Sequence, residues 1–593
     1  MNFMRFLVLG PVLVFALLCR ASSSAPQTDR SPHDLALSAD GRWAVTANFT
    51  ANSASLIDLV EGKVVAEVPV GQKPFCVALS PGGTRALVTN WFSNTVSLLS
   101  VEPPGMKQLA DIPVSAEPRG VAFAPDGKTA FVACGADSEI NFLDLETRTV
   151  TQRLRVRREP WHLAVSPDGQ WLVVGNTGAS CVTVVNVAKR EVERTVPIYG
   201  NNIRQLAVSA DSQSAYVTHT GERGFPTTLE DIDRGWVIAN RVTRFPLDGK
   251  TPKEALSLDP AGRASGDAEG LAVSPNGQWM AIASAGAHEI LMFRHPLPWT
   301  AYGGPGDHME QELLRGTGRF RWLILGGRPL SARFTPDSQQ LIVANYLLND
   351  LQIVDVETMK LIRTIDLGGP KTPTELRRGE AIFYDASRTF HQWFSCHTCH
   401  PDGHTNHGNF DTFNDGAFGN PKKTLSLRGV GSTGSWTWHG HVDSLEEAVA
   451  GSLTTTLHGA SPTEAEVRAL TAFLETLDFP PNPYRAEDGT LSESARRGQA
   501  LFAQRGCGRC HAGANFTSWG GFNVGTKEAI DRYHGYNPPT LRNVYDRSPY
   551  LHDGRAFTLT DLLRKHHTPE KLVGTPPFNE AELADVVEFL KSL

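Results

Sequence analysis

The chain has 593 residues, of which 40% are hydrophobic and 20% are charged, and its formal net charge is −7. This balance is typical of a folded globular protein, and it excludes a disordered or collagen-like chain. With this charge we expect no broad basic surface for nucleic acid. Thirteen of the 19 histidines follow residue 390, and no methionine follows residue 359. The last third therefore differs chemically from the rest, which predicts a boundary near residue 370.

Residues 1–25 have the pattern of an export signal. Arg5 provides a short positive start, an apolar stretch runs from Phe6 to Leu18, and small residues follow it. This order is typical of a cleaved signal peptide. The alternative is an uncleaved anchor, but an apolar stretch of about 13 residues is too short to cross a ~30 Å hydrocarbon core. We therefore expect a periplasmic or otherwise exported protein with no membrane span after cleavage.

A turn motif recurs seven times between residues 33 and 369. The first five copies start 42, 44, 42 and 43 residues apart, and the next two gaps are 65 and 61 residues. Each copy places Ser-Pro-Asp-Gly-like residues between two hydrophobic strands, where Pro and Gly favour a tight reversal. Four short strands in about 43 residues match one propeller blade. The pattern resembles YVTN-type β-propellers and predicts an all-β seven-bladed propeller over residues 26–369.

The two long gaps predict insertions on two of the blades. One insertion runs from Gly221 to Gly235 on blade five, and the other runs from His295 to Arg328 on blade six. Long loops on a rigid scaffold often carry function. The alternatives are a decorative loop and a loop that docks the C-terminal domain.

Two Cys-x-x-Cys-His motifs carry the chemistry, and their residues are Cys396, Cys399 and His400, then Cys507, Cys510 and His511. In such a motif two thiols fit the two vinyl groups of one haem, and the adjacent histidine becomes an axial ligand of the iron. A zinc site or a redox dithiol would leave the adjacent histidine unexplained in both copies. The sequence therefore predicts two covalently bound c-type haems, with His400 and His511 as metal ligands.

The region around the two motifs is an internal duplication. An Arg-Arg-Gly sequence precedes each motif, at residues 377–379 and 496–498. Three later residue pairs, such as Leu427 and Leu541, share one offset of 114 residues. Each half ends in a predicted helix, at residues 464–477 and 580–593. We expect a mostly α domain of two duplicated lobes, residues 370–484 and 485–593, with one haem each.

The C-terminal domain resembles the dihaem cytochrome c peroxidase and MauG family. The matching stretches include residues 539–544 and 549–554. The resemblance implies that the first haem reacts with peroxide, that the second haem relays electrons, and that a tryptophan lies between them. Trp438 is our candidate for this tryptophan, with Trp436 beside it in the sequence and a packing role as the alternative. The resemblance also implies a calcium ion between the lobes.

The residues facing the two haem irons are predicted from the duplication. The family places Met or Tyr on the second haem, and the aligned residue here is His566, with His567 next to it. We predict His566 as the second iron ligand opposite His511, the alternative being a solvated helix residue. The ungapped offset pairs His566 with Ser452 in the first half, and serine is a poor haem ligand. The first haem is therefore predicted to keep an open side.

Two catalytic residues of the family have no counterpart here. The distal glutamine aligns with Ala448, and the acid–base glutamate aligns with His458. His458 can shuttle protons, because histidine titrates in the right range. It can also bind the first iron and close that site, or act as a bystander.

These observations predict an exported dihaem c-type redox enzyme that is peroxidase-like. The haem at His400 reacts with peroxide or dioxygen, and the haem at His511 relays electrons from a redox protein or an organic donor. The propeller serves as a platform for the partner or substrate. Three alternatives remain: an electron carrier with both haems six-coordinate, a MauG-like oxidase of protein side chains, and a ligand-binding propeller whose haems sense redox state.

Overall fold

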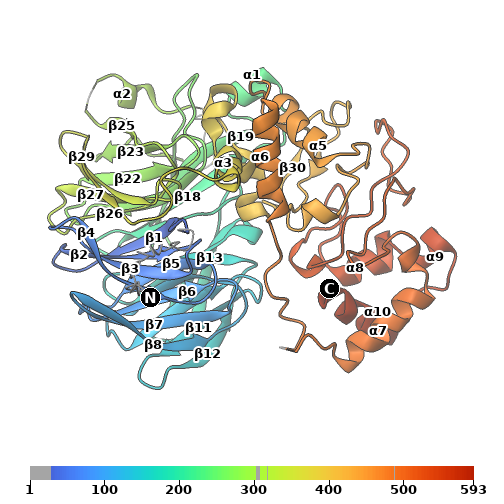
Figure 1. Cartoon of the computed structure of the whole chain (residues 1–593), viewed down its shortest axis with the longest axis horizontal. Helices are drawn as coiled ribbons and strands as arrows, with labels where there is room; N and C mark the ends of the chain where they lie inside the picture. The colour runs from blue at the N-terminus through green and yellow to red at the C-terminus, as the bar shows by residue number, and fades with distance from the viewer. Residues whose placement is uncertain (1–27, 302–307, 317, 487) are drawn as a thin grey trace, which may run out of the picture.

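The structure is a computed structural model that describes residues 28–301, 308–316, 318–486 and 488–593. A ring of strands forms one part of the molecule and a mostly helical region forms the other (Figure 1). The predicted fold class, an all-β propeller followed by a mostly α region, is confirmed. The predicted export signal at residues 1–25 lies outside the described residues.

The described part of the ring consists of seven antiparallel sheets, and each sheet is one blade. In the first four blades the strands lie side by side in chain order, so short hairpins connect them. The first two blades contain β1 (Pro32–Leu37), β2 (Trp43–Asn48), β3 (Ser53–Asp58), β4 (Lys63–Pro69), β5 (Pro74–Leu79), β6 (Arg85–Asn90), β7 (Thr95–Glu102) and β8 (Gly105–Pro113). The next two contain β9 (Pro118–Phe123), β10 (Thr129–Cys134), β11 (Glu139–Asp144), β12 (Thr149–Arg155), β13 (Pro160–Val165), β14 (Trp171–Asn176), β15 (Cys181–Asn186) and β16 (Glu191–Pro197).

The last three blades include the two insertions. Their strands are β17 (Leu206–Val208), β18 (Ser214–Glu222), β19 (Ile238–Pro246), β20 (Glu254–Ser257), β21 (Ala268–Val273), β22 (Trp279–Ser284), β23 (Glu289–Arg294), β24 (Thr300–Ala301), β25 (Phe320–Ile324), β26 (Pro329–Phe334), β27 (Gln340–Asn345), β28 (Asp350–Asp355) and β29 (Lys360–Asp366). The blade-six insertion contains α2 (Gln311–Leu314) and β24, which pairs with β20 as a fifth strand of blade five. The blade-five insertion contains α1 (Leu229–Asp233) and contacts the helical region, where Thr227 N donates to Asp411 O at 2.9 Å.

The repeated turn explains why each blade begins with a hairpin. In the first blade Ser38 Oγ donates to Asp40 Oδ1 at 2.5 Å and accepts from Trp43 N at 2.9 Å. Gly41 has a φ of +71°, in the left-handed region that favours glycine. These side-chain hydrogen bonds to nearby backbone groups are what make Ser and Asp strong turn residues.

Apolar side chains between neighbouring blades form the core of the ring. The ring closes where the first and last blades meet, with Leu35, Ile57 and Ile342 in one buried cluster. Ser331 Oγ donates to Asp34 Oδ1 at 2.6 Å across the same junction. Because full burial of one such aliphatic side chain contributes about 1.5–3 kcal/mol, the closure is stabilised mainly by apolar contacts.

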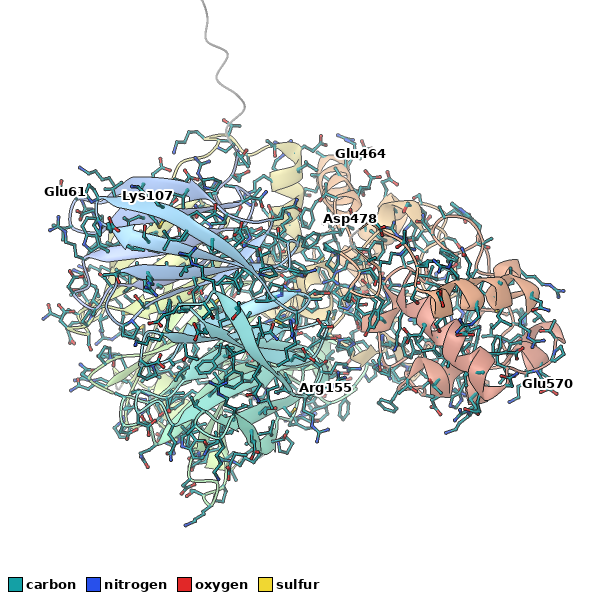
Figure 2. The ribbon with its side chains drawn as sticks, turned by 90° about the horizontal axis from the view of Figure 1, so that it is seen from below. Glu61, Lys107, Arg155, Glu464, Asp478 and Glu570 are labelled. Atoms are coloured by element: carbon teal, nitrogen blue, oxygen red, sulfur yellow. The ribbon has the colours of Figure 1, made fainter. Side chains whose placement is uncertain are left out.

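The helical region has two lobes, and we call residues 370–484 the first lobe and residues 485–593 the second lobe. The first lobe contains α3 (Glu375–Phe383), α4 (Cys396–Cys399), β30 (Asn409–Phe410), β31 (Lys422–Lys423), α5 (Leu445–Gly451) and α6 (Glu464–Glu475). The second lobe contains α7 (Glu493–Gln504), α8 (Leu559–Asp561), α9 (Pro569–Val573) and α10 (Glu580–Lys591). Figure 2 shows Glu464 and Asp478 in the lobe beside the propeller and Glu570 at the far end of the second lobe.

The Arg-Arg-Gly repeat marks equivalent helix crossings in the two lobes. A Cβ atom on Gly379 would lie 1.9 Å from Ala469 O, where α3 crosses α6. A Cβ atom on Gly498 would lie 2.0 Å from Asp585 O, where α7 crosses α10. Glycine is therefore required at both crossings for the backbones to approach. No described helix combines the length and the apolar character that a membrane crossing requires.

Candidate functional site: two cavities lined by Cys-x-x-Cys-His motifs

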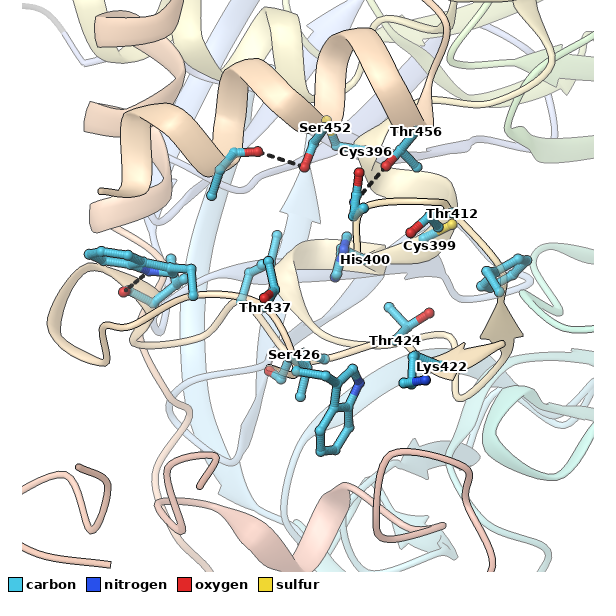
Figure 3. Close-up of a pocket in the computed structure, with 18 of the residues that line it drawn as sticks. Cys396, Cys399, His400, Thr412, Lys422, Thr424, Ser426, Thr437, Ser452 and Thr456 are labelled. Carbon is cyan, nitrogen blue, oxygen red and sulfur yellow. Dashed lines mark hydrogen bonds between the residues drawn. The ribbon is translucent and has the colours of Figure 1, made fainter. Parts of the chain in front are cut away.

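The first motif lies on the wall of a cavity in the first lobe. Ser395 caps the start of α4, and Cys396, Cys399 and His400 line a cavity of about 300 Å³ (Figure 3). His400 Nδ1 lies 3.3 Å from His404 O, so Nδ1 donates and Nε2 is left as an acceptor. Burial lowers the pKa of His400 to about 4. The imidazole is therefore neutral, as metal binding requires.

The second motif has the same arrangement in the second lobe. Cys507, Cys510 and His511 line a cavity of about 260 Å³. His511 Nδ1 lies 3.1 Å from Phe516 O, and burial lowers the pKa of His511. In both lobes a backbone carbonyl thus fixes the tautomer of the motif histidine, which is how metal-binding histidines are usually oriented.

The residues present fit a covalently bound c-type haem in each cavity. The motif cysteines are free thiols beside cavities whose other walls are largely apolar. Lys423 and Arg547 line the first cavity, and desolvation together with the nearby Arg547 and Arg158 lowers the pKa of Lys423 to about 7. These buried cations would be stabilised by an anion such as a haem propionate. When bound, haem supplies a redox-active iron with open or occupied axial positions.

His567, rather than His566, faces the second motif histidine. The ring centroids of His511 and His567 lie 6.2 Å apart, and His567 lines the second cavity. Two imidazoles that bind one metal ion from opposite sides have centroids about 6 Å apart, because each metal–nitrogen bond is about 2 Å long. His566 is not in the lining of this cavity, and its Nε2 lies 3.8 Å from the Asp561 carboxylate. Of the two histidines, His567 is therefore the one that lies across the second cavity from His511, and the identity of a second iron ligand stays a prediction.

The turns that follow α5 and α8 contribute different residues to the two cavities. A π-helical turn follows α5 at Ser452–Thr456, and another follows α8 at Leu562–His566. Ser452, Thr456 and Leu457 line the first cavity, whereas His567 lines the second. Among the described residues, the turn after α5 therefore offers the first cavity no histidine.

His458 does not line the first cavity. Its backbone has a φ of +49°, and its Nε2 donates to Thr227 O of the propeller insertion at 2.6 Å. The cavity wall near His400 instead carries Ser452 and Thr456, which Figure 3 shows on the helical turn above the histidine. In this structure His458 therefore neither faces the cavity as a proton shuttle nor lies in its lining as an iron ligand.

If the first cavity reacts with peroxide, as the family resemblance implies, replacement of His458 by alanine should leave that turnover within about twofold of the parent protein. The lost hydrogen bond to Thr227 should lower the free energy of unfolding by about 1 kcal/mol. Steady-state kinetics and thermal melting of the holoprotein would measure both effects. A loss of turnover greater than tenfold would show that His458 takes part in catalysis.

Trp438 lies between the two cavities. It lines both of them, together with Asn537 and Pro539. Trp438 Nε1 donates to Lys423 O at 2.6 Å, which fixes the indole against β31. Trp436 lines only the first cavity and has its ring centroid 5.9 Å from that of Trp519.

The propeller holds the first motif directly. Ser395 Oγ donates to Asp267 Oδ2 at 2.6 Å, and Thr398 donates to the other oxygen of the same carboxylate. His397 Nε2 lies 2.7 Å from Glu269 Oε1. Asp267 is 5% exposed and His397 is 2% exposed, so the loop that carries the first pair of thiols is buried against the propeller. The sequence contained no local signal for these contacts, because Asp267 and Glu269 lie more than 100 residues before the motif.

Replacement of Asp267 by alanine should therefore loosen the first motif. Hydrogen bonds to a charged group contribute about 1.5–3 kcal/mol each, so we expect a loss of about 2–4 kcal/mol in the free energy of unfolding. Denaturant titration would measure this loss. Replacement of the exposed Asp126, in the repeated turn of another blade, would be the control and should cost less than about 1 kcal/mol.

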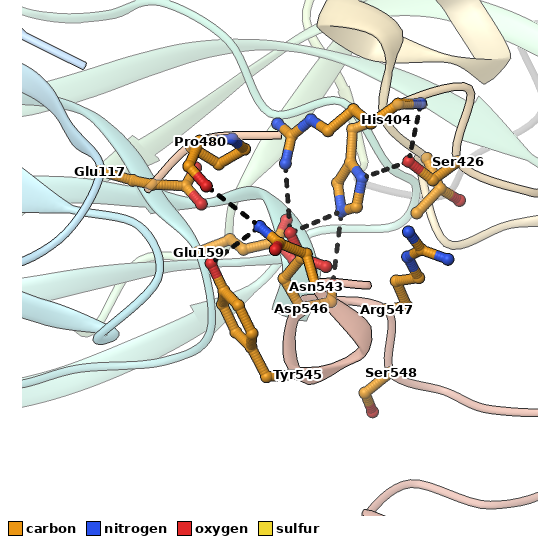
Figure 4. Close-up of polar contacts among 12 residues, drawn as sticks. Glu117, Glu159, His404, Ser426, Pro480, Asn543, Tyr545, Asp546, Arg547 and Ser548 are labelled. Carbon is orange, nitrogen blue, oxygen red and sulfur yellow. Dashed lines mark hydrogen bonds and ion pairs between the residues drawn. The ribbon is translucent and has the colours of Figure 1, made fainter. Parts of the chain in front are cut away.

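Both lobes and the propeller meet in one buried polar junction (Figure 4). His404 Nδ1 lies 3.0 Å from Ser426 Oγ, and His404 Nε2 lies 3.4 Å from Asp546 O. Arg428 of the first lobe forms an ion pair of 3.1 Å with Asp546 of the second lobe. On the propeller side, His407 Nε2 lies 2.8 Å from Glu159 Oε1. These contacts fix the positions of the two cavities relative to each other.

Comparison with known proteins agrees with both parts of this architecture. Residues 18–222 match the family described as "Lactonase, 7-bladed beta-propeller", and residues 495–593 match the family described as "Cytochrome c". A solved structure of hydrazine synthase from Kuenenia stuttgartiensis has a TM-score of 0.50 and 24% identity. That likeness covers 56% of this chain and 98% of the solved chain, and it concerns the fold.

Three curated relatives match parts of the chain. Hydrazine synthase subunit gamma of K. stuttgartiensis is 27% identical over 37% of this chain and 77% of its own. Methylamine utilization protein MauG of Methylorubrum extorquens is 25% identical over 38% of this chain and 79% of its own. Cytochrome c551 peroxidase of Nitrosomonas europaea is 28% identical over 21% of this chain and 42% of its own. The chain thus joins a seven-bladed β-propeller to a region that matches the cytochrome c family and is similar in sequence to MauG and cytochrome c551 peroxidase.

Proposed function

We propose that the chain binds two c-type haems and reduces peroxide at the first of them. The observation that carries this proposal is the difference between the two cavities. His567 lines the second cavity with its ring centroid 6.2 Å from that of His511, whereas the described lining of the first cavity contains no histidine besides His400 and His439. The second site is therefore closed by a protein ligand, and the first site is open to a small ligand.

In this proposal, the first cavity is where peroxide is reduced, and the second cavity is where electrons enter. Reduction of one hydrogen peroxide molecule consumes two electrons and two protons and yields two water molecules. A redox protein or an organic donor supplies both electrons through the second lobe. Trp438, which lines both cavities, bridges the electron path. Dioxygen is the alternative oxidant for the same open site.

The electron-carrier alternative requires a second protein ligand in the first cavity. Besides His400, the histidine in its described lining is His439, whose Nδ1 donates to Gly535 O at 2.8 Å. Its Nε2 lies 3.5 Å from both Asp415 and Asp531. His439 is thus engaged by the contact between the lobes, which favours the peroxidase over the carrier.

We further propose that the protein works outside the cytoplasm, after cleavage of the export signal expected at residues 1–25. Its propeller acts as a rigid support that buries the first motif loop through Asp267 and Glu269. A partner or substrate would then bind to other faces of the propeller.

Electron paramagnetic resonance of the ferric holoprotein tests the proposal, with haem counted on the same sample. We expect two haems per chain, one high-spin and one low-spin, and consumption of peroxide by the reduced protein. Two low-spin haems, together with no reaction with peroxide in any reduction state, would support the electron carrier instead.

A further inference from the structure

The contact between the lobes contains a cluster of cation-binding side chains. Asp415, His439 and Asp531 each offer a ligand atom, and these atoms all lie within 4.8 Å of one another. Among the described residues, this is the group of possible metal ligands that draws on both lobes. It is therefore where a metal ion held by acidic and histidine side chains of both lobes would bind.

The ammonium group of Lys422 lies in this cluster. Lys422 Nζ donates to Asp531 Oδ1 at 2.9 Å and lies 3.8 Å from Asp415 Oδ2. The Lys422 side chain is 11% exposed, and that of Asp531 is 0% exposed. A positive charge from the first lobe is thus buried against a carboxylate from the second lobe.

The remaining contacts of Asp531 leave no room for a metal ion. Its Oδ2 accepts from Tyr536 Oη at 2.5 Å and from Glu528 N at 2.8 Å. Its Oδ1 accepts from Asn420 Nδ2 as well as from Lys422. A carboxylate has about four lone-pair positions, and here all four have donors. Calcium needs about six to eight oxygen ligands, so the cluster does not fit calcium as it stands.

Two atoms of the cluster still require a positive charge nearby. Asp415 Oδ2 and His439 Nε2 are buried and have no hydrogen-bond partner. His439 Nε2 lies 3.5 Å from Asp415 Oδ2 and 3.5 Å from Asp531 Oδ1. Two buried carboxylates that face one another are unfavourable without a cation between or beside them. Lys422 is the cation that the structure places there.

Lys422 is also connected to both cavities through β31. The next residue, Lys423, accepts a hydrogen bond at its carbonyl from Trp438 Nε1 at 2.6 Å. Lys423 N donates to the carbonyl of His552 at 2.6 Å, and His552 lines the second cavity. A shift of β31 would therefore move Trp438 relative to the second lobe.

We infer that Lys422 is a built-in cation that takes the place of a metal ion in this cluster and positions Trp438 between the two cavities. Only the part concerning electron flow through Trp438 rests on the proposed function. The lobe contact itself requires no activity of the protein.

The first experiment measures metal dependence of the holoprotein. We expect less than about 0.1 calcium per chain after purification with a chelator, and a melting temperature that neither chelator nor millimolar calcium changes. One calcium per chain, whose removal lowers the melting temperature, would overturn the inference. This measurement is independent of peroxide turnover, so failure of the proposed function would not affect it.

The second experiment removes the cation. Lys422→Met should lower the melting temperature by several degrees, because loss of one partner leaves buried carboxylates uncompensated. Lys527→Met, at an exposed lysine of the second lobe, is the matched control and should cause no such shift. Lys422→Arg keeps the charge and should fold even if Lys422→Met does not. Equal melting temperatures for Lys422→Met and Lys527→Met would contradict the inference.

A third measurement separates positioning from stability. Stopped-flow absorbance would follow electron equilibration between the two haems below the melting transition. We expect Lys422→Met to slow it about tenfold at unchanged haem content, since small displacements of a positioned group cost large factors in rate. Lys422→Arg should retain most of the rate. If Lys422→Met leaves the rate of electron equilibration unchanged, Lys422 does not position Trp438.

Discussion

Replacement of His567 by alanine should convert the second haem from low-spin to high-spin. The ring of His567 lies 6.2 Å from that of His511, so its removal opens the axial position that it is placed to fill. We expect loss of nearly all of the low-spin signal in electron paramagnetic resonance. Peroxide turnover should fall at least tenfold, because an open second haem reorganises more on reduction and so relays electrons more slowly.

His566 provides the matched control for this experiment. It is adjacent to His567 but outside the cavity lining, and its side chain lies near Asp561. Replacement of His566 by alanine should leave the spin state and turnover unchanged. The reverse result, with His566 essential and His567 dispensable, would show that the turn after α8 differs in the holoprotein.

Replacement of Trp438 by phenylalanine should strongly reduce turnover. Trp438 lines both cavities, and phenylalanine lacks both the indole π system and the Nε1 donor that holds it to Lys423. We expect turnover with a donor that reduces the second lobe to fall by at least tenfold. Both haems should stay bound with their spin states unchanged, which spectra of the ferric protein would check.

Trp436 is the control for this substitution. It lines the first cavity but not the second, and its Nε1 donates to Val430 O at 3.2 Å. Replacement of Trp436 by phenylalanine should reduce turnover by less than about threefold. Equal effects of the two substitutions would mean that Trp438 acts through packing rather than as a bridge.

The sequence was informative where function depends on local spacing. The seven turn motifs give the seven blades, because each turn needs only residues within a few positions, as Ser38 and Asp40 show. Likewise the two cavities contain the two Cys-x-x-Cys-His motifs. Trp438, which the family resemblance implied as the bridge, lines both cavities, and its role as a bridge stays a prediction.

The sequence could not predict positions that depend on a local helix conformation or on a distant contact. His566 and His567 are adjacent, and the offset of 114 residues could not tell which of them lines the second cavity. His458 lies away from the cavity because a propeller insertion offers it the Thr227 carbonyl. Asp267 and Glu269 contact the first motif across the fold, and no periodicity or spacing in the chain connects them with it.

The contacts of the first motif with the propeller bear on the order in which the protein can be assembled. Machinery that attaches a c-type haem must reach both thiols, and Cys396 and Cys399 are only partly exposed on a loop that Asp267 and Glu269 hold. If the chain takes haem at this motif, that machinery has freer access before the propeller and the first lobe dock. Maturation of the haem site would then precede closure of the fold.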